Sequence, residues 1–262
     1  MLTYPAFDPI AFHIFSWPVY WYGLMYLVGF VGGWALISMR LRISPWRGFT
    51  QDQLSDIVFF TALGGILGGR LGYILFYDAH VIFTHPVEIL QTWRGGMSIH
   101  GGLLGAAMAI YYCSRKIKKP FLVITDLIVP AVPLGLGAGR FGNFINGELW
   151  GRVTTVPWAM VFPDAGSQPR HPSQLYEVFL EGFVLFTVVW LFSRKERPRG
   201  AVTGLFLLLY GVFRLFVECF READAQIGYF AHGWLTEGQL LSIPAILIGV
   251  VLLMVAYRKS PK

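Results

Sequence analysis

The chain alternates long apolar runs with short polar segments, and 55% of its residues are hydrophobic while only 14% are charged. A helix needs about 20 predominantly apolar residues to cross a bilayer. Runs long enough for this cover residues 19–38, 57–77, 97–113, 121–139, 174–193, 201–217 and 238–257. The pattern is far more apolar than that of a soluble domain. It predicts an all-α membrane protein with seven transmembrane helices.

Basic residues follow every second span, which predicts the orientation of the chain. They come after the first, third, fifth and seventh spans, as Arg40, Arg42, Arg47; Arg115, Lys116, Lys118, Lys119; Arg194, Lys195, Arg197, Arg199; and Arg258, Lys259, Lys262. Loops rich in Lys and Arg lie on the cytoplasmic side of a membrane. We therefore expect the N-terminus outside, the C-terminus in the cytoplasm, and the segments 78–96, 140–173 and 218–237 on the outer face.

The pattern indicates a single integral membrane domain, residues 1–262, because no low-complexity linker and no internal repeat interrupts it. The outer segment 140–173 is too long for a simple turn and contains Trp150, Trp158 and Phe162. Aromatic residues of this kind suit a membrane interface. We expect this segment to form a small ordered head on the outer face, and residues 1–18 to lie along the same interface as a short amphipathic element.

Glycines recur at a spacing of four residues on two of the predicted spans. Gly64, Gly68 and Gly72 lie on the second span, and Gly101 and Gly105 on the third. This spacing lets helix backbones approach closely in lipid. We interpret these glycines as helix-packing residues rather than as ligand contacts.

Charge and motifs exclude several classes of function. The net charge of +6 follows from the basic loops, so topology and contact with anionic lipid explain it without a nucleic-acid partner. No GxSxG, HExxH, P-loop or dinucleotide-binding motif occurs, and no Cys/His set has metal-ligand spacing. The two cysteines, Cys113 and Cys219, suggest no disulfide. We predict no metal site and no cofactor.

Polar residues gather where spans meet the outer face. Arg140 and Asn143 follow the fourth span, while Tyr210, Arg214 and Glu218 share one face of the sixth span at i, i+4 spacing. Arg214 and Glu218 could simply neutralise each other at a helix end. Alternatively, Arg140 adds a positive charge that Glu218 does not neutralise, and the two arginines then form a binding site for an anion. A phospholipid phosphate is such an anion, because Arg binds phosphate oxygens with bidentate geometry.

Two further residues stand out within or beside spans. His100 opens the third span, and its ordinary pKa of about 6.5 suits a general base, although a lone histidine at a helix end can also be a hydrogen-bonded structural residue. Arg70 lies well inside the second span. For Arg70 we favour an internal partner such as Glu181 over a substrate contact.

Several stretches resemble the bacterial prolipoprotein diacylglyceryl transferase family. The most specific is the thirteen-residue run Arg140-Phe-Gly-Asn-Phe-Ile-Asn-Gly-Glu-Leu-Trp-Gly-Arg152. Others agree in order along the chain: Trp21–Tyr26, Gly69–Tyr73, Gly96–Gly102, Arg170–Glu177 and Tyr210–Arg221. One departure is Tyr20, where we expect many relatives to carry histidine.

The resemblance implies a multi-pass enzyme of the bacterial inner membrane whose active site faces the periplasm. Its reaction moves the diacylglyceryl group of phosphatidylglycerol to the lipobox cysteine in the signal peptide of a preprolipoprotein. A thioether forms and glycerol phosphate leaves. The resemblance assigns catalysis to His100 as the base and to Arg140 and Arg214 on the phosphate. It assigns substrate binding to Tyr22, Asn143, Asn146, Glu148, Gly151, Tyr210, Glu218 and Arg221.

Two other functions compete with this one. A non-catalytic lipid carrier would use Arg140 and Arg214 to bind phosphatidylglycerol, but it needs access to both leaflets, whereas the polar groups cluster at one depth. An intramembrane protease needs a Ser/His or Asp pair, and Ser98 and His100 lie only two residues apart. The sequence favours the transferase.

Overall fold

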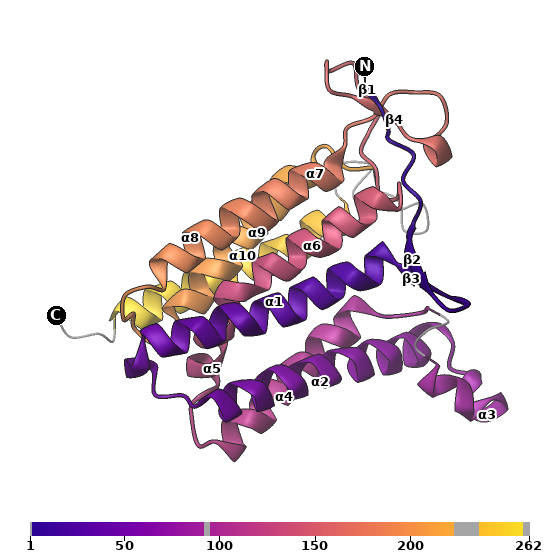
Figure 1. Ribbon diagram of the computed structural model, residues 1–262. Coiled ribbons are helices and arrows are strands. Elements are labelled where there is room, and N and C mark those ends of the chain that lie inside the picture. The colour runs from indigo at the N-terminus through magenta and orange to yellow at the C-terminus, as the bar shows by residue number, and fades with distance from the viewer. Residues whose placement is uncertain (1, 92–94, 223–235, 259–262) are drawn as a thin grey trace. The chain divides into compact units, whose positions relative to one another are not determined.

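The computed structural model describes residues 2–91, 95–222 and 236–258 (Figure 1). The chain divides into two compact units. The first unit comprises Met1–Gly33 with Asp126–Lys262, and the second comprises Trp34–Thr125.

Among the described residues, six helical segments are long and apolar enough to cross a membrane. They are α1 (Trp21–Ile43), α2 (Gln51–Tyr77), the segment Phe121–Ile145, the segment Ser173–Phe192, α9 (Ala201–Glu218) and α10 (Glu237–Arg258). The remaining predicted run, residues 97–113, is also helical, as α4 (Ile99–Lys116). It is not among the six, because this helix of 18 residues includes His100, Arg115 and Lys116 and is less apolar than the others.

In the second unit, α2 and α4 lie side by side and touch through glycines (Figure 1). A Cβ atom built on Gly72 would lie 2.8 Å from the Cα atom of Gly101, and one built on Gly68 would lie 2.8 Å from that of Gly105. Ordinary side chains have no room there, so the predicted helix-packing role of these glycines is confirmed. Short helical turns complete this unit: η1 (Pro45–Arg47), α3 (Val81–Thr84) and η2 (Pro86–Leu90).

In the first unit, two of the spanning segments are irregular. A 3-10 turn, η4 (Val129–Ala131), separates α5 (Phe121–Ile128) from α6 (Val132–Ile145). Pro130 and Pro133 lack the N–H groups that a regular α-helix would need at this point. The segment Ser173–Phe192 consists of α7 (Ser173–Glu177), the π-helix η6 (Val178–Val184) and α8 (Leu185–Phe192).

Close helix contacts hold the irregular segments together. A Cβ atom on Gly137 of α6 would lie 3.0 Å from the Cα atom of Gly182 of η6, so the two backbones touch without side chains between them. A buried cluster of Val129, Leu185, Val189, Val202 and Phe206 joins α8 and α9 deeper in the unit.

Short strands accompany the helices. Strand β1 (Leu2–Thr3) pairs in parallel with β4 (Met160–Val161), and β2 (Ile10–Ile14) pairs antiparallel with β3 (Trp17–Tyr20). The predicted amphipathic element at residues 1–18 is therefore built mainly of strands. The Tyr4 hydroxyl donates to the backbone carbonyls of Phe144 and Ile145, at 2.7 and 2.8 Å.

Two details of the predicted head segment are wrong. Helix α6 continues to Ile145, so Arg140 and Asn143 lie on its last turns and not beyond the span. Phe162 is fully buried against Tyr4 and Phe144 rather than exposed at an interface. This small aromatic core fixes residues 160–165, which include η5 (Pro163–Ala165), onto the end of α6.

Candidate active site

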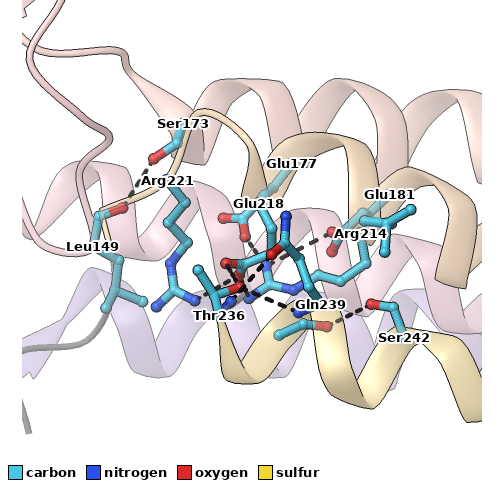
Figure 2. A network of polar contacts seen from close by, with 12 residues as sticks. Leu149, Ser173, Glu177, Glu181, Arg214, Glu218, Arg221, Thr236, Gln239 and Ser242 are labelled. Carbon is cyan, nitrogen blue, oxygen red and sulfur yellow. Dashed lines mark hydrogen bonds and ion pairs between the residues drawn. The ribbon is translucent and has the colours of Figure 1, made fainter. Parts of the chain in front are cut away.

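Arg214 on α9 lies at the centre of a buried network of charged side chains (Figure 2). Its Nη1 atom contacts Oε1 of Glu177 on α7 and lies 3.8 Å from Oε1 of Glu181 on η6. Its Nη2 atom contacts Oε1 of Glu218, one turn further along α9. The contact between Arg214 and Glu218 that their i, i+4 spacing predicted is thus present, and two more carboxylates join it.

Glu177 bridges two arginines. Its Oε1 atom accepts a hydrogen bond from Arg214, and its Oε2 atom lies 3.4 Å from Nε of Arg140 on α6. The side chain of Glu177 is completely buried. Because α6 and η6 touch at Gly137 and Gly182, α6 comes close enough for Arg140, three residues after Gly137, to reach this carboxylate.

The π-helix η6 places a second carboxylate beside the same guanidinium. Glu181 is completely buried, and neither of its oxygens has a hydrogen-bond partner in the described part of the chain. A carboxylate without hydrogen bonds inside a membrane helix is costly, so its position 3.8 Å from the Arg214 guanidinium is informative. π-Helical turns occur frequently at functional sites.

Glu218 extends the network to the start of α10. Its Oε1 atom also accepts from Nη1 of Arg221 at 3.0 Å, and its Oε2 atom accepts from the Thr236 hydroxyl at 2.9 Å. Thr236 in turn accepts from the backbone N–H of Gln239 at 3.2 Å. A single carboxylate therefore ties the end of α9 to the first turn of α10 (Figure 2).

Two amide side chains at the end of α6 donate to another carboxylate. Nδ2 of Asn143 donates to Oε1 of Glu148 at 2.8 Å, and Nδ2 of Asn146 donates to the same atom at 3.3 Å. Gln174 donates to the backbone carbonyl of Glu148 at 2.6 Å, and Ser173 to that of Leu149 at 3.1 Å. The predicted residues Asn143, Asn146 and Glu148 thus form one hydrogen-bonded cluster, held by the start of α7.

Gly151 lies where three backbone segments meet. Its N–H donates to the carbonyl of His171 at 2.9 Å, and it forms a bridge with Arg221. A Cβ atom on Gly151 would lie 2.7 Å from the Cβ atom of His171. Only glycine fits this position, so Gly151 allows the three backbone segments to pack closely.

His171 ends a short chain of polar side chains. Nε1 of Trp158 donates to the Tyr176 hydroxyl at 2.7 Å, and this hydroxyl lies 3.0 Å from Nδ1 of His171. The Tyr176 oxygen accepts from Trp158, so its own hydrogen is available to His171. Burial lowers the pKa of His171 from its ordinary value, which agrees with a neutral imidazole that accepts this hydrogen bond.

Tyr22, Tyr210 and His100 complete the predicted set. The hydroxyl of Tyr22 lies 3.1 Å from that of Tyr26, and the Tyr22 ring covers Gly142 of α6. Tyr210 stacks on Phe206 of the same helix, with 5.9 Å between ring centroids. His100 belongs to the second unit, where it is the second residue of α4 and exposed.

Two predictions about charge are wrong. Arg70 does not pair with Glu181: it donates to backbone carbonyls of the second unit, whereas Glu181 lies beside Arg214. The expected surplus of positive charge is also absent from the network as described. Three carboxylates, those of Glu177, Glu181 and Glu218, accompany the guanidinium groups of Arg140, Arg214 and Arg221. The sequence feature that could have predicted these carboxylates is the pair Glu177 and Glu181, which lie four residues apart in an apolar run.

The network leaves one arginine available to an anion. The side chain of Arg140 is 20% exposed, twice the exposed fraction of Arg214 at 10%. Its ion pair with Glu177 uses Nε, and within the described residues neither Nη nitrogen of Arg140 has a hydrogen-bond partner. Two such N–H groups match two oxygens of a phosphate. Within the same residues, no group of three or more His, Cys, Asp or Glu side chains is arranged to hold a metal ion.

Comparison with known proteins identifies the family of this chain. A family model described as prolipoprotein diacylglyceryl transferase matches residues 9–255. A protein of Coxiella burnetii (strain RSA 331 / Henzerling II), named phosphatidylglycerol--prolipoprotein diacylglyceryl transferase, is 58% identical over 262 residues, which is 100% of both chains. A protein of Pseudomonas paraeruginosa (strain DSM 24068 / PA7) with the same name is 54% identical over 99% of this chain and 97% of its own. The chain belongs to the prolipoprotein diacylglyceryl transferase family.

Proposed function

We propose that this chain transfers the diacylglyceryl group of phosphatidylglycerol to the lipobox cysteine of a preprolipoprotein. The observation that carries the proposal is full-length identity of 54% and 58% to relatives named for this activity. The pair of arginines bridged by Glu177 supports it, because this pair suits a phosphate in a membrane.

The reaction exchanges one bond on the lipid. The cysteine sulfur attacks the terminal carbon of the diacylglycerol, the bond from that carbon to the phosphate oxygen breaks, and glycerol phosphate leaves with one more negative charge. Arg140 and Arg214 stabilise this growing charge electrostatically. Because Glu177 fixes both guanidinium groups before the substrate arrives, little reorganisation is needed during the reaction.

His100 takes the proton from the attacking thiol. A free cysteine has a pKa of about 8.5, so only a small fraction is thiolate at neutral pH. A base beside it raises that fraction. The chain need not supply the nucleophile itself, and its own cysteines stay outside this reaction: Cys113 is buried within α4, and Cys219 caps the end of α9.

The remaining polar residues hold the two substrates. Asn143, Asn146 and Glu148 form the hydrogen-bonded cluster at the end of α6, and they orient the head group or the peptide. Glu218 holds Arg214, Arg221 and, through Thr236, the start of α10 in place. Tyr22, Tyr210 and Gly151 shape the walls around these groups.

We also propose the predicted topology for this enzyme. Helix α4 serves as the third of seven spans, the N-terminus lies outside, and the C-terminus lies in the cytoplasm of a bacterium. The protein lies in the inner membrane as a single integral membrane domain, and the active site and the head segment, which begins after Ile145 and ends at residue 173, face the periplasm. The basic residues after alternate spans support this orientation.

One assay tests the function. Purified protein is incubated with phosphatidylglycerol vesicles and a lipobox peptide, and mass spectrometry looks for a diacylglyceryl thioether. A peptide with serine in place of the lipobox cysteine is the substrate control. We expect Arg140→Ala and Arg214→Ala each to abolish the adduct, whereas Arg115→Ala, at the far end of α4, keeps it. Product from both arginine variants at wild-type rates would disprove the assigned roles.

A further inference from the structure

Arg70 binds the backbone on both sides of the loop between α3 and α4. It lies on α2 and is only 8% exposed. Its Nη2 donates to the carbonyl of Glu88 at 2.7 Å and its Nε to that of Ile89 at 3.2 Å. Its Nη1 donates to the carbonyls of Gly95 and Gly96, at 2.7 and 3.1 Å. Four of the five N–H groups of the guanidinium are therefore used on carbonyls.

The two glycines are needed for this geometry. Gly95 and Gly96 both adopt positive φ, at 83° and 71°, a conformation that side chains disfavour. A Cβ atom on Gly96 would also lie 2.6 Å from Cε1 of Tyr73. Tyr73 lies one turn after Arg70 on α2, and its ring centroid is 6.0 Å from the Arg70 guanidinium carbon. The loop thus presents two successive carbonyls to one buried cation.

The same turn of α2 also fixes the first residues of α4. The Ser98 N–H donates to the carbonyl of Gly69 at 2.8 Å. The Ser98 hydroxyl accepts from the Gly101 N–H at 3.3 Å and caps the helix. Gly69 and Arg70 therefore hold residues 95, 96 and 98, and His100 follows two residues later on the first turn of α4.

We infer that Arg70 is a positioning residue for His100: its guanidinium fixes the backbone that enters α4 and so sets where the His100 imidazole lies. This rests on the proposed function, in which His100 is the base. Arg70 acts through the loop and not on substrate, because its donors are used on carbonyls and its side chain is buried. A displacement of about 1 Å at a catalytic group can cost about 100-fold in rate.

The test is a double-mutant cycle with His100. Arg70→Met removes every donor, and we expect kcat to fall about 100-fold while KM for phosphatidylglycerol stays unchanged. Arg70→Lys keeps a cation that can reach some of the carbonyls, so it should recover part of the rate and should fold even if Arg70→Met does not. In a His100→Asn background, neither Arg70 substitution should lower kcat further, because the group being positioned is gone. Arg115→Met, at the far end of α4, is the matched control.

Amide hydrogen exchange gives a second readout that needs no activity. Exchange of residues 98–103 should speed up in Arg70→Lys and stay unchanged in Arg115→Met, while the rest of α4 keeps its protection. Additive losses in the cycle, a loss through KM alone, or unchanged exchange at the start of α4 would each overturn the inference. A wild-type chain that makes no thioether would instead overturn the proposed function, and the exchange data would still decide whether Arg70 orders this turn.

Discussion

Replacing Glu177 by glutamine tests whether one bridging carboxylate organises the two arginines. Glutamine has nearly the same shape, but it carries no charge, and its amide nitrogen would face a guanidinium. Glu177 is completely buried and serves Arg140 at 3.4 Å and Arg214 at closer range. Removing one partner from a buried ion pair costs about 3–5 kcal/mol, because the remaining charge loses its compensation. We expect the free energy of unfolding to fall by an amount of this order.

The effect on catalysis should differ from the effect on binding. Without Glu177 the site gains net positive charge, so the anionic lipid should bind at least as well. The guanidinium groups lose their fixed spacing, however, and kcat should fall on the order of 100-fold. Steady-state kinetics with phosphatidylglycerol vesicles separates the two constants, and chemical denaturation in detergent measures the stability.

Glu222→Gln is the matched control for this change. Glu222 pairs with Arg170 at 3.1 Å, and its side chain is 44% exposed. An exposed pair contributes roughly 0–1 kcal/mol, so this variant should keep its stability and its activity. If Glu177→Gln behaved like Glu222→Gln, or raised KM while leaving kcat intact, the bridging role would be refuted.

Three further predictions concern other parts of the chain. His100→Asn should slow transfer most at neutral pH and recover partly at alkaline pH, where the substrate thiol ionises unaided; a loss equal at every pH would argue against a base. Gly151→Ala should destabilise the fold by about 1–3 kcal/mol through overpacking, which the denaturation midpoint will show. Burial lowers the pKa of His171, so its neutral form is favoured in the folded state. Stability should therefore fall as the pH drops below the ordinary histidine pKa, and His171→Phe should remove that part of the decline.

Local spacing predicted much of this fold. The contact between Arg214 and Glu218 could be predicted because both residues lie on one helix at i, i+4 spacing. The four-residue spacing of the glycines in α2 and α4 likewise predicted that these helices pack closely. Hydropathy placed the long helices within about six residues at each end: α2 begins six residues before its predicted start, and α6 ends six residues after its predicted end.

Contacts between distant segments were not predictable in the same way. The pairing of Arg140 with Glu177 depends on the approach of α6 to η6, and nothing in the sequence near Arg140 encodes it. Arg70 illustrates the opposite error, because a buried cation was expected to find a carboxylate. Backbone carbonyl oxygens accept the hydrogen bonds of Arg70 instead. A loop that bends at two glycines can supply such carbonyls, and the sequence does not show toward which side chain they point. Likewise, β1 pairs with β4 across most of the chain length.

Because of the π-helix η6, the geometry of the charged network depends on the number of residues in this segment as well as on their identity. A π-helical turn is wider than an α-helical one, with i→i+5 hydrogen bonds, so deleting one apolar residue between Glu177 and Leu185 would let Val178–Val184 relax to ordinary helix and move Glu181 around the helix relative to Glu177. Every polar group would survive such a deletion, yet the acidic side chains could no longer converge on α9. Homologous chains that keep all of these groups but differ in length here would share the composition of this centre without its geometry.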